Sequence, residues 1–245
     1  TLAWSSAASD VYKRQIKSSE IAPAFLAEFS QLIDEVNLPN GVVNIVHGGI
    51  SCGQSLTSHK FINKVFFTGG TNTASHIIKN SSENFAQLNL ELGGKSAALI
   101  FDDCDLENTL NNIITGVYSG NGESCISSSL CLLQENIYDE FITKLIERVH
   151  KIKLGPPLET SSNMGPLAHE KQVKFIENQV KKSVEQGAKI LVGGKRVENL
   201  KSSLYFEPTI IACSDRSIST SKTELFGPVL SVIKFKSEEE AISIA

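Results

Sequence analysis

The chain has 245 residues, of which 41% are hydrophobic and 20% charged, and its net charge is −4 at pH 7. This composition is typical of a globular protein with a substantial core in one or two domains, and it excludes the strongly basic surface of a nucleic-acid-binding protein. No segment approaches the roughly 18 apolar residues that a membrane-spanning helix needs, and no secretory signal is evident.

The first half of the chain shows an alternation of strands and helices after an irregular start. Residues 1–15 are rich in Ser and Ala without a clear period, and they are interpreted as an atypical leader outside the native fold. Apolar periodicity and turn residues then predict the elements in chain order: a helix over 21–33, a strand over 42–46, a helix opening within 54–59, a strand over 64–67, a helix ending at 78 and a strand over 88–91.

The second half continues the same pattern. It predicts strands over 97–101, 130–134, 189–192 and 229–235, and helices over 106–117, 138–149 and 172–184. Strands that alternate with helices favour an α/β fold with a parallel sheet. The glycine pairs 48–49 and 69–70 follow predicted strands, and such turns either bind phosphate through helix N-terminal N–H groups or are plain tight turns. A domain boundary is predicted at Gly93-Gly94.

Three segments carry residue types suited to covalent chemistry. They are Leu90-Glu91-Leu92-Gly93-Gly94-Lys95-Ser96-Ala97, Gly122-Glu123-Ser124-Cys125 and Glu224-Leu225-Phe226-Gly227-Pro228. Taken singly, each has a structural interpretation: a surface carboxylate, a core thiol at the start of a helix, and a solvated loop charge. The five cysteines contain no Cys-x-x-Cys pair, and the five histidines show no metal-ligand spacing, so neither a disulfide framework nor a metal site is predicted.

Together and in this order, the three segments resemble the NAD(P)-dependent aldehyde dehydrogenase family, including the spacing of 34 residues between Glu91 and Cys125. The resemblance runs from Ile16 to the end of the chain. It implies a Rossmann-like, parallel-sheet cofactor-binding part over residues 16–93, followed by an α/β catalytic domain over residues 94–245.

The resemblance also implies a mechanism. Cys125 is the expected nucleophile: its thiolate adds to the aldehyde carbonyl to give a hemithioacetal, and loss of hydride leaves a thioester. Glu91 is the expected general base for hydrolysis of that thioester. A helix beginning at Cys125 is expected to favour the thiolate, and its backbone N–H is expected to be one oxyanion donor. Lys95 matches the motif but receives no role.

The same resemblance assigns cofactor contacts to residues in both parts of the chain: Lys17, Glu20, Gly48, Gly69, Gly70, Leu92, Glu224 and Phe226. Lys17 and Glu20 are expected at the adenosine ribose, where a carboxylate disfavours a 2′-phosphate and so favours NAD over NADP, with NADP still open. The expected substrate is a small aldehyde that the sequence does not identify. A homo-dimer or homo-tetramer in the cytoplasm is expected.

Several departures from the family pattern stand beside this interpretation. Ala74, Ser127 and Leu130 occupy positions where the family has other residues, and no Pro-Trp-Asn segment precedes Lys17. The chain is therefore expected to be an internal fragment, truncated at both ends. Two alternatives remain: a truncated non-catalytic remnant that only binds nucleotide, and a CoA-acylating relative. CoA-acylating relatives generally lack the glutamate base, so Glu91 argues against that alternative.

Overall fold

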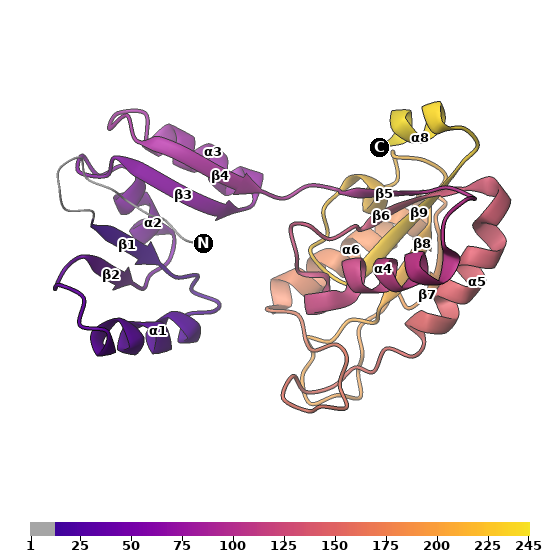
Figure 1. Cartoon of the computed structure of the whole chain (residues 1–245), viewed down its shortest axis with the longest axis horizontal. Helices are drawn as coiled ribbons and strands as arrows, with labels where there is room; N and C mark the ends of the chain where they lie inside the picture. Colours follow the sequence, from indigo (N-terminus) through magenta and orange to yellow (C-terminus); the bar gives the residue numbers. More distant parts are fainter. Residues whose placement is uncertain (1–12) are drawn as a thin grey trace. The chain divides into compact units, whose positions relative to one another are not determined.

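The computed structural model describes residues 13–245, which form two compact units divided between Gly93 and Gly94 (Figure 1). Each unit has a hydrophobic core of its own. Residues 1–12, most of the predicted leader, lie outside the described residues. At its end the leader prediction is wrong, because Arg14 and Gln15 belong to a strand that pairs in parallel with a second strand.

The first unit consists of two strand–helix–strand crossovers joined by a helix. Its elements are β1 (Arg14–Lys17), α1 (Ala24–Glu35), β2 (Val43–Val46), α2 (Ile50–Thr57), β3 (Lys64–Gly69), α3 (Thr71–Asn80) and β4 (Gln87–Leu92). β1 pairs with β2 and β3 with β4, both in parallel, and a parallel pair requires a crossover connection such as a helix. The predicted alternation is confirmed, although α2 begins earlier than expected, directly after Gly49.

The core of the first unit lies between β3 and α3. Val65 and Phe67 of β3 pack with Ala74 and Ile77 of α3. Ala74 is buried, so the methyl group at this departure from the family pattern is accommodated. By contrast, no residue of α1 is buried, and Phe25 is 76% exposed. The helical period of α1 is confirmed, but several of its apolar side chains, Phe25, Phe29 and Leu32, are exposed.

The second unit is built on one five-stranded sheet with the order β5-β6-β9-β8-β7. Its main elements are β5 (Ala97–Ile100), α4 (Leu106–Tyr118), β6 (Leu130–Gln134), α5 (Tyr138–Val149), α6 (Glu170–Glu185), β7 (Lys189–Val192), β8 (Thr209–Ala212), α7 (Ser219–Lys222), β9 (Val229–Phe235) and α8 (Glu238–Ile244). Two short 3₁₀ turns are η1 (Ser119–Gly122) and η2 (Glu135–Ile137). The pairings are parallel except at the edge, where β7 runs antiparallel to β8.

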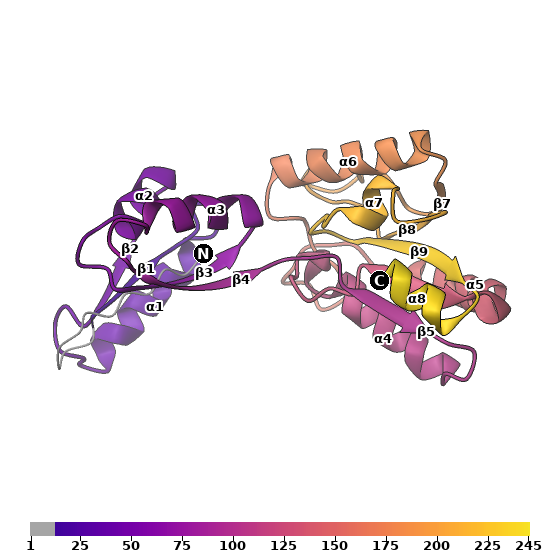
Figure 2. The same ribbon diagram turned by 90° about the horizontal axis from the view of Figure 1, so that it is seen from above.

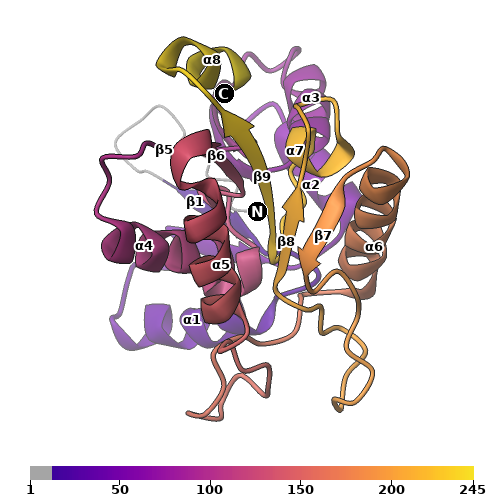
Figure 3. The ribbon, with the colours of Figure 1, turned by 90° about the vertical axis from the view of Figure 1, so that its right-hand side faces the viewer.

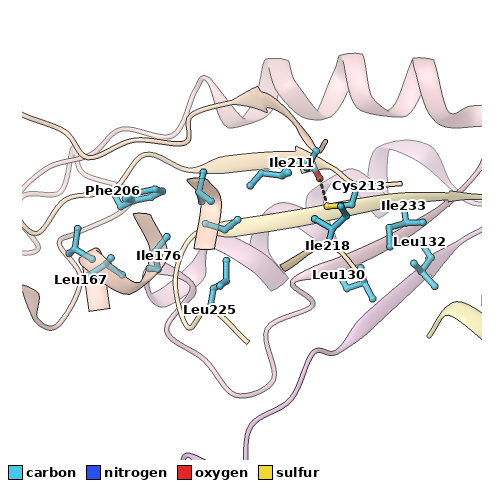
Figure 4. Close-up of a cluster of buried hydrophobic side chains, with 14 of the residues drawn as sticks. Leu130, Leu132, Leu167, Ile176, Phe206, Ile211, Cys213, Ile218, Leu225 and Ile233 are labelled. Carbon is cyan, nitrogen blue, oxygen red and sulfur yellow. Dashed lines mark hydrogen bonds between the residues drawn. The ribbon is translucent and has the colours of Figure 1, made fainter. Parts of the chain in front are cut away.

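Helices cover both faces of this sheet (Figure 3). Leu130 and Leu132 of β6 pack in the cluster that includes α6, whereas Cys131 and Leu133 pack in the cluster that includes α4 and α5. The α6-side cluster also holds Leu225 (Figure 4), which anchors the third sequence motif in the core. Within residues 13–245, no helix is both long enough and apolar enough to cross a membrane.

Candidate functional site

The segment that carries Cys125 lies between α4 and β6. It begins with three consecutive residues at positive φ: Gly120 (58°), Asn121 (62°) and Gly122 (71°). Cys125 follows in a turn closed by a hydrogen bond from the Ser127 N–H to the Ser124 carbonyl, 3.2 Å, and the thiol side chain is exposed. The predicted helix start at Cys125 is wrong: Cys125 and Ile126 lie in a turn, and β6 begins only five residues after Cys125.

Two side chains anchor this turn to the loop before α6. Asn121 accepts a hydrogen bond from the Gly165 N–H through Oδ1 (2.8 Å) and donates through Nδ2 to the Pro166 carbonyl (3.0 Å). Glu123 accepts from the Ala168 N–H (3.0 Å). Burial raises the pKa of the Glu123 carboxyl above its usual value, and the Ala168 N–H opposes part of that rise. Sequence reasoning missed both anchors, although an Asn-Gly pair before the cysteine is a signal for a left-handed turn.

We expect Asn121→Ala to lower the free energy of unfolding by about 1–3 kcal/mol. The substitution removes the hydrogen bonds to the Gly165 N–H and the Pro166 carbonyl, and it places alanine at positive φ. Asn121→Gly is the matched control: it loses the same two hydrogen bonds but adopts positive φ readily, so it should be about 1 kcal/mol more stable than the alanine variant. Urea denaturation measures both. If Asn121→Ala were as stable as the wild type, the anchoring role of Asn121 would be wrong.

The second and third sequence motifs meet at two glycines. A Cβ atom added to Gly122 would lie 2.3 Å from the Gly227 carbonyl oxygen, so the two backbones approach as closely as glycine permits. Next to Gly227, Phe226 also has a positive φ (49°), and its side chain is 41% exposed. Its carbonyl accepts a hydrogen bond from Gln172 Nε2 (3.1 Å). The structure therefore brings the Cys125 turn and the Glu224–Pro228 segment together within one unit.

Glu224 lies half-buried in the same segment. Its Oε1 atom is buried and has no hydrogen-bond partner among the described residues. Burial raises the pKa of this carboxyl; the Gly94 N–H and the Lys95 ammonium act in the opposite direction. An ionised carboxylate accepts hydrogen bonds at both of its oxygens.

In the first unit, the predicted contacts Lys17, Glu20 and Gly48 gather where β1 and β2 end. Lys17 Nζ donates to the Ser18 carbonyl (2.8 Å) and lies 3.8 Å from Glu20 Oε2. Ser18 Oγ and His47 Nδ1, 2.7 Å apart, join the two strand ends. This pair was also missed by sequence reasoning. Because carboxyl ends of parallel strands share one edge of a sheet, they are where α/β folds place ligands.

Glycines open both helices that follow the strands of this unit. Gly49 is the N-cap residue of α2 and Gly70 that of α3, and neither helix start is capped by a side chain. A Cβ atom added at Gly49 or Gly70 would meet nothing within 4 Å. The C-terminal ends of the two helices are joined where the Ser81 hydroxyl donates to the Thr57 carbonyl (3.1 Å), and the helices lie side by side (Figure 2). Their free N–H groups are suited to bind phosphate.

Glu91 and Leu92 close β4, where Glu91 stands opposite Thr68 of β3. Both side chains are exposed, and Asn89 Nδ2 donates to Glu91 Oε1 at 3.4 Å. Glu91 and Leu92 thus belong to the first unit, together with Gly69 and Gly70, while Cys125, Glu224 and Phe226 belong to the second. Within residues 13–245, no group of three or more His, Cys, Asp or Glu side chains is placed to hold a metal ion.

The cysteines differ sharply in their surroundings. Cys125 is exposed, Cys52 and Cys104 are half-buried, and Cys131 and Cys213 are buried. Burial raises the pKa of the Cys131 thiol to about 12, so this residue is not reactive near neutral pH. The prediction that Cys131 is buried is confirmed.

Comparison with known proteins gives one consistent result. The sequence profile described as "Aldehyde dehydrogenase family" matches residues 15–245. A dehydrogenase of Acinetobacter baylyi, named for (Z)-2-((N-methylformamido)methylene)-5-hydroxybutyrolactone, is 47% identical over 94% of this chain and 47% of its own length. The chloroplastic betaine aldehyde dehydrogenase of Atriplex hortensis is 38% identical over 94% of the chain and 46% of its own length.

A solved structure agrees with these sequences. Betaine aldehyde dehydrogenase from Staphylococcus aureus, crystallised in complex with NAD+, superposes with a TM-score of 0.91 at 39% identity, covering 94% of this chain and 46% of that one. The chain thus spans a little under half the length of these proteins.

Proposed function

The chain belongs to the aldehyde dehydrogenase family, and we propose that its protein oxidises an aldehyde to a carboxylic acid with NAD(P)+ through a thioester on Cys125. The observation that carries this proposal is the exposed Cys125 in a turn fixed by Asn121 and Glu123 and packed against the Gly227 segment. A nucleophile needs both access and a fixed position, and the buried Cys131 and Cys213 of the second unit lack access.

The residues of the chain fit a dinucleotide. The open N-termini of α2 and α3, which follow Gly48-Gly49 and Gly69-Gly70, would bind the pyrophosphate. Lys17 and Glu20 would hold the adenosine ribose, and the Glu20 carboxylate favours NAD over NADP by repelling a 2′-phosphate. Glu224, with its unpartnered Oε1, would hold the nicotinamide ribose beside Phe226, and Leu92 would line the cofactor. The bound cofactor supplies the hydride acceptor.

The protein groups then act in sequence. Cys125 Sγ adds to the aldehyde carbon, and the Cys125 N–H stabilises the oxyanion that forms. After hydride has left, the acyl group remains on Sγ as a thioester. Glu91 takes a proton from water, whose oxygen attacks the thioester and releases the carboxylic acid together with the thiol.

The alkylation rate of Cys125 tests the central assignment. Iodoacetamide is expected to label Cys125 before the other four cysteines and faster than free cysteine, as read by peptide mass spectrometry. Labelling of Cys125 no faster than free cysteine would favour the alternative of a non-catalytic remnant that only binds nucleotide.

Glu91→Gln separates the two halves of the reaction. We expect a first turnover of NADH formation to remain while steady-state turnover falls by about 100- to 10,000-fold, because only thioester hydrolysis requires the base. Stopped-flow absorbance measures both phases. Glu83→Gln, an exposed carboxylate of the same unit, is the matched control. Steady-state turnover that is unchanged in Glu91→Gln and requires added CoA would argue for the CoA-acylating alternative, in which CoA and not water receives the acyl group.

The oligomeric state and the cellular location of the protein are also proposals. The resemblance supports a homo-dimer or homo-tetramer and a cytoplasmic location, whereas some relatives are named as peroxisomal, in Pisum sativum, or chloroplastic, in Atriplex hortensis.

A further inference from the structure

The histidine that follows β2 has no role in the proposed reaction. His47 comes directly after Val46, the last residue of β2, and its side chain is exposed. Its Nδ1 atom lies 2.7 Å from Oγ of Ser18, a residue that is only 2% exposed. A buried hydroxyl needs a hydrogen-bond partner, and Ser18 has one in the ring of a residue at the neighbouring strand end. This hydrogen bond therefore orients an exposed imidazole.

The orientation leaves the second ring nitrogen of His47 free. Nδ1 is engaged by Ser18, and Nε2 has no hydrogen-bond partner among residues 13–245. A serine hydroxyl can donate or accept, and a protonated imidazole carries a hydrogen on each nitrogen. When the Ser18 hydroxyl donates to Nδ1, the neutral ring carries its hydrogen on Nε2. Ser18 thus allows Nε2 to be a donor in both forms of the ring.

The charged side chains at the same strand ends already have partners. Lys17 Nζ donates to the Ser18 carbonyl (2.8 Å) and lies 3.8 Å from Glu20 Oε2. In the proposed function, this pair of opposite charges holds the adenosine ribose. His47 adds a donor without an acceptor, two residues before Gly49, the N-cap residue of α2. A free N–H donor beside a ribose site is suited to an anionic acceptor, and the anionic groups of a dinucleotide are its phosphates.

We propose that His47 binds a phosphate oxygen in the adenosine half of the cofactor through Nε2, and that Ser18 is a positioning residue that orients its ring. This inference rests on the proposed function. The same chemistry serves two phosphate groups: the pyrophosphate that NAD and NADP share, and the 2′-phosphate that only NADP carries. A hydrogen bond to the 2′-phosphate would oppose its repulsion by Glu20, and His47 would then determine how well NADP is accepted.

Three small ligands separate the two phosphates: adenosine carries none, ADP carries its phosphates at the 5′ position, and 2′-AMP carries one at the 2′ position. NMR titration of the whole chain measures their affinities. His47→Asn removes Nε2 but keeps a polar group for Ser18. It should weaken binding of ADP, of 2′-AMP or of both by about tenfold, the size expected for one charge-assisted hydrogen bond, and leave adenosine binding unchanged.

Two further variants complete this experiment. His47→Gln, whose longer side chain carries an amide N–H, should restore part of the lost affinity. His76→Asn, which changes an exposed histidine of α3, should leave all three ligands unaffected. The inference is overturned if His47→Asn weakens adenosine as much as the phosphate-bearing ligands, or if it weakens none of them.

A double-mutant cycle tests the role of Ser18. Ser18→Ala should weaken the same ligand as His47→Asn, and it should have no further effect on binding in the His47→Asn protein, because it acts only through the ring. The ¹⁵N shifts of the His47 ring should also change in Ser18→Ala, since Nδ1 loses its partner. Unchanged ring shifts or fully additive losses of affinity would overturn the positioning role.

The wild-type protein separates this inference from the proposed function. If it binds NAD and ADP, and His47→Asn binds both with the same affinity and 2′-AMP as well, the inference fails and the proposed function stands. If the wild-type protein binds neither NAD nor ADP, the proposed function fails and the inference fails with it.

Discussion

Cys125→Ser is expected to reduce aldehyde-dependent NADH formation by at least about 1000-fold, the scale seen when a catalytic nucleophile is removed. A serine hydroxyl is hardly ionised near neutral pH, so it does not add to the carbonyl at a useful rate. NAD binding should be unaffected, because the assigned cofactor contacts are other residues. Turnover is measured by absorbance and binding by calorimetry.

The matched control is Cys104→Ser, which changes a half-buried cysteine in the same unit. It should retain turnover within a few-fold of the wild type. Loss of activity in both variants to the same degree would point to a folding defect. Near wild-type turnover in Cys125→Ser would remove Cys125 from the mechanism.

Gly122→Ala is expected to destabilise the protein by about 3 kcal/mol or more. Two causes act together: the residue has φ of +71°, and its new Cβ would lie 2.3 Å from the Gly227 carbonyl oxygen and 2.8 Å from the Pro228 nitrogen. These are backbone atoms, so the clash cannot be relieved by rotating a side chain. The Cys125 turn and the Glu224–Pro228 segment would have to separate.

Gly116→Ala provides the contrast for this experiment. Gly116 lies inside α4, and a Cβ atom there would make an ordinary contact of 3.7 Å with Ser128 Oγ. Alanine in a helix interior is favoured over glycine by about 1 kcal/mol or slightly less, so this variant should be as stable as the wild type or more stable. Thermal and urea unfolding measure both. Equal stability of Gly122→Ala and the wild type would show that the close approach is absent.

The sequence predicted most of the regular elements because their patterns are local. The apolar run 130–133 is the fully buried part of β6, and the spacing in 138–149 matched α5 at both ends. The elements missed include β1, β8, α7 and α8, and α7 is the polar sequence Ser-Thr-Ser-Lys. Their stability comes from neighbours such as β9, which pairs with β8, and sequence periodicity carries no information on such neighbours.

The sequence predicted less of the candidate site than of the fold. The resemblance pointed to Cys125 and Glu224, but the helix expected at Cys125 is a turn that follows three successive positive-φ residues. The meeting of Gly122 with Gly227 joins positions more than a hundred residues apart, and no local pattern encodes it. The Ser18–His47 pair likewise joins two strand ends that are 29 residues apart.

The anchored turn has a consequence for the chemical ageing of the protein. An asparagine followed by glycine loses ammonia when the glycine nitrogen attacks its side-chain carbonyl, and the chain has two such pairs, Asn40-Gly41 and Asn121-Gly122. Asn40 is exposed, whereas the Asn121 amide is tied at both ends to Gly165 and Pro166. Deamidation should therefore begin at Asn40. Deamidation of Asn121 would replace its amide, which donates to the Pro166 carbonyl, with a carboxylate that cannot donate. An aged sample would then lose the support of the Cys125 turn before any peptide bond breaks.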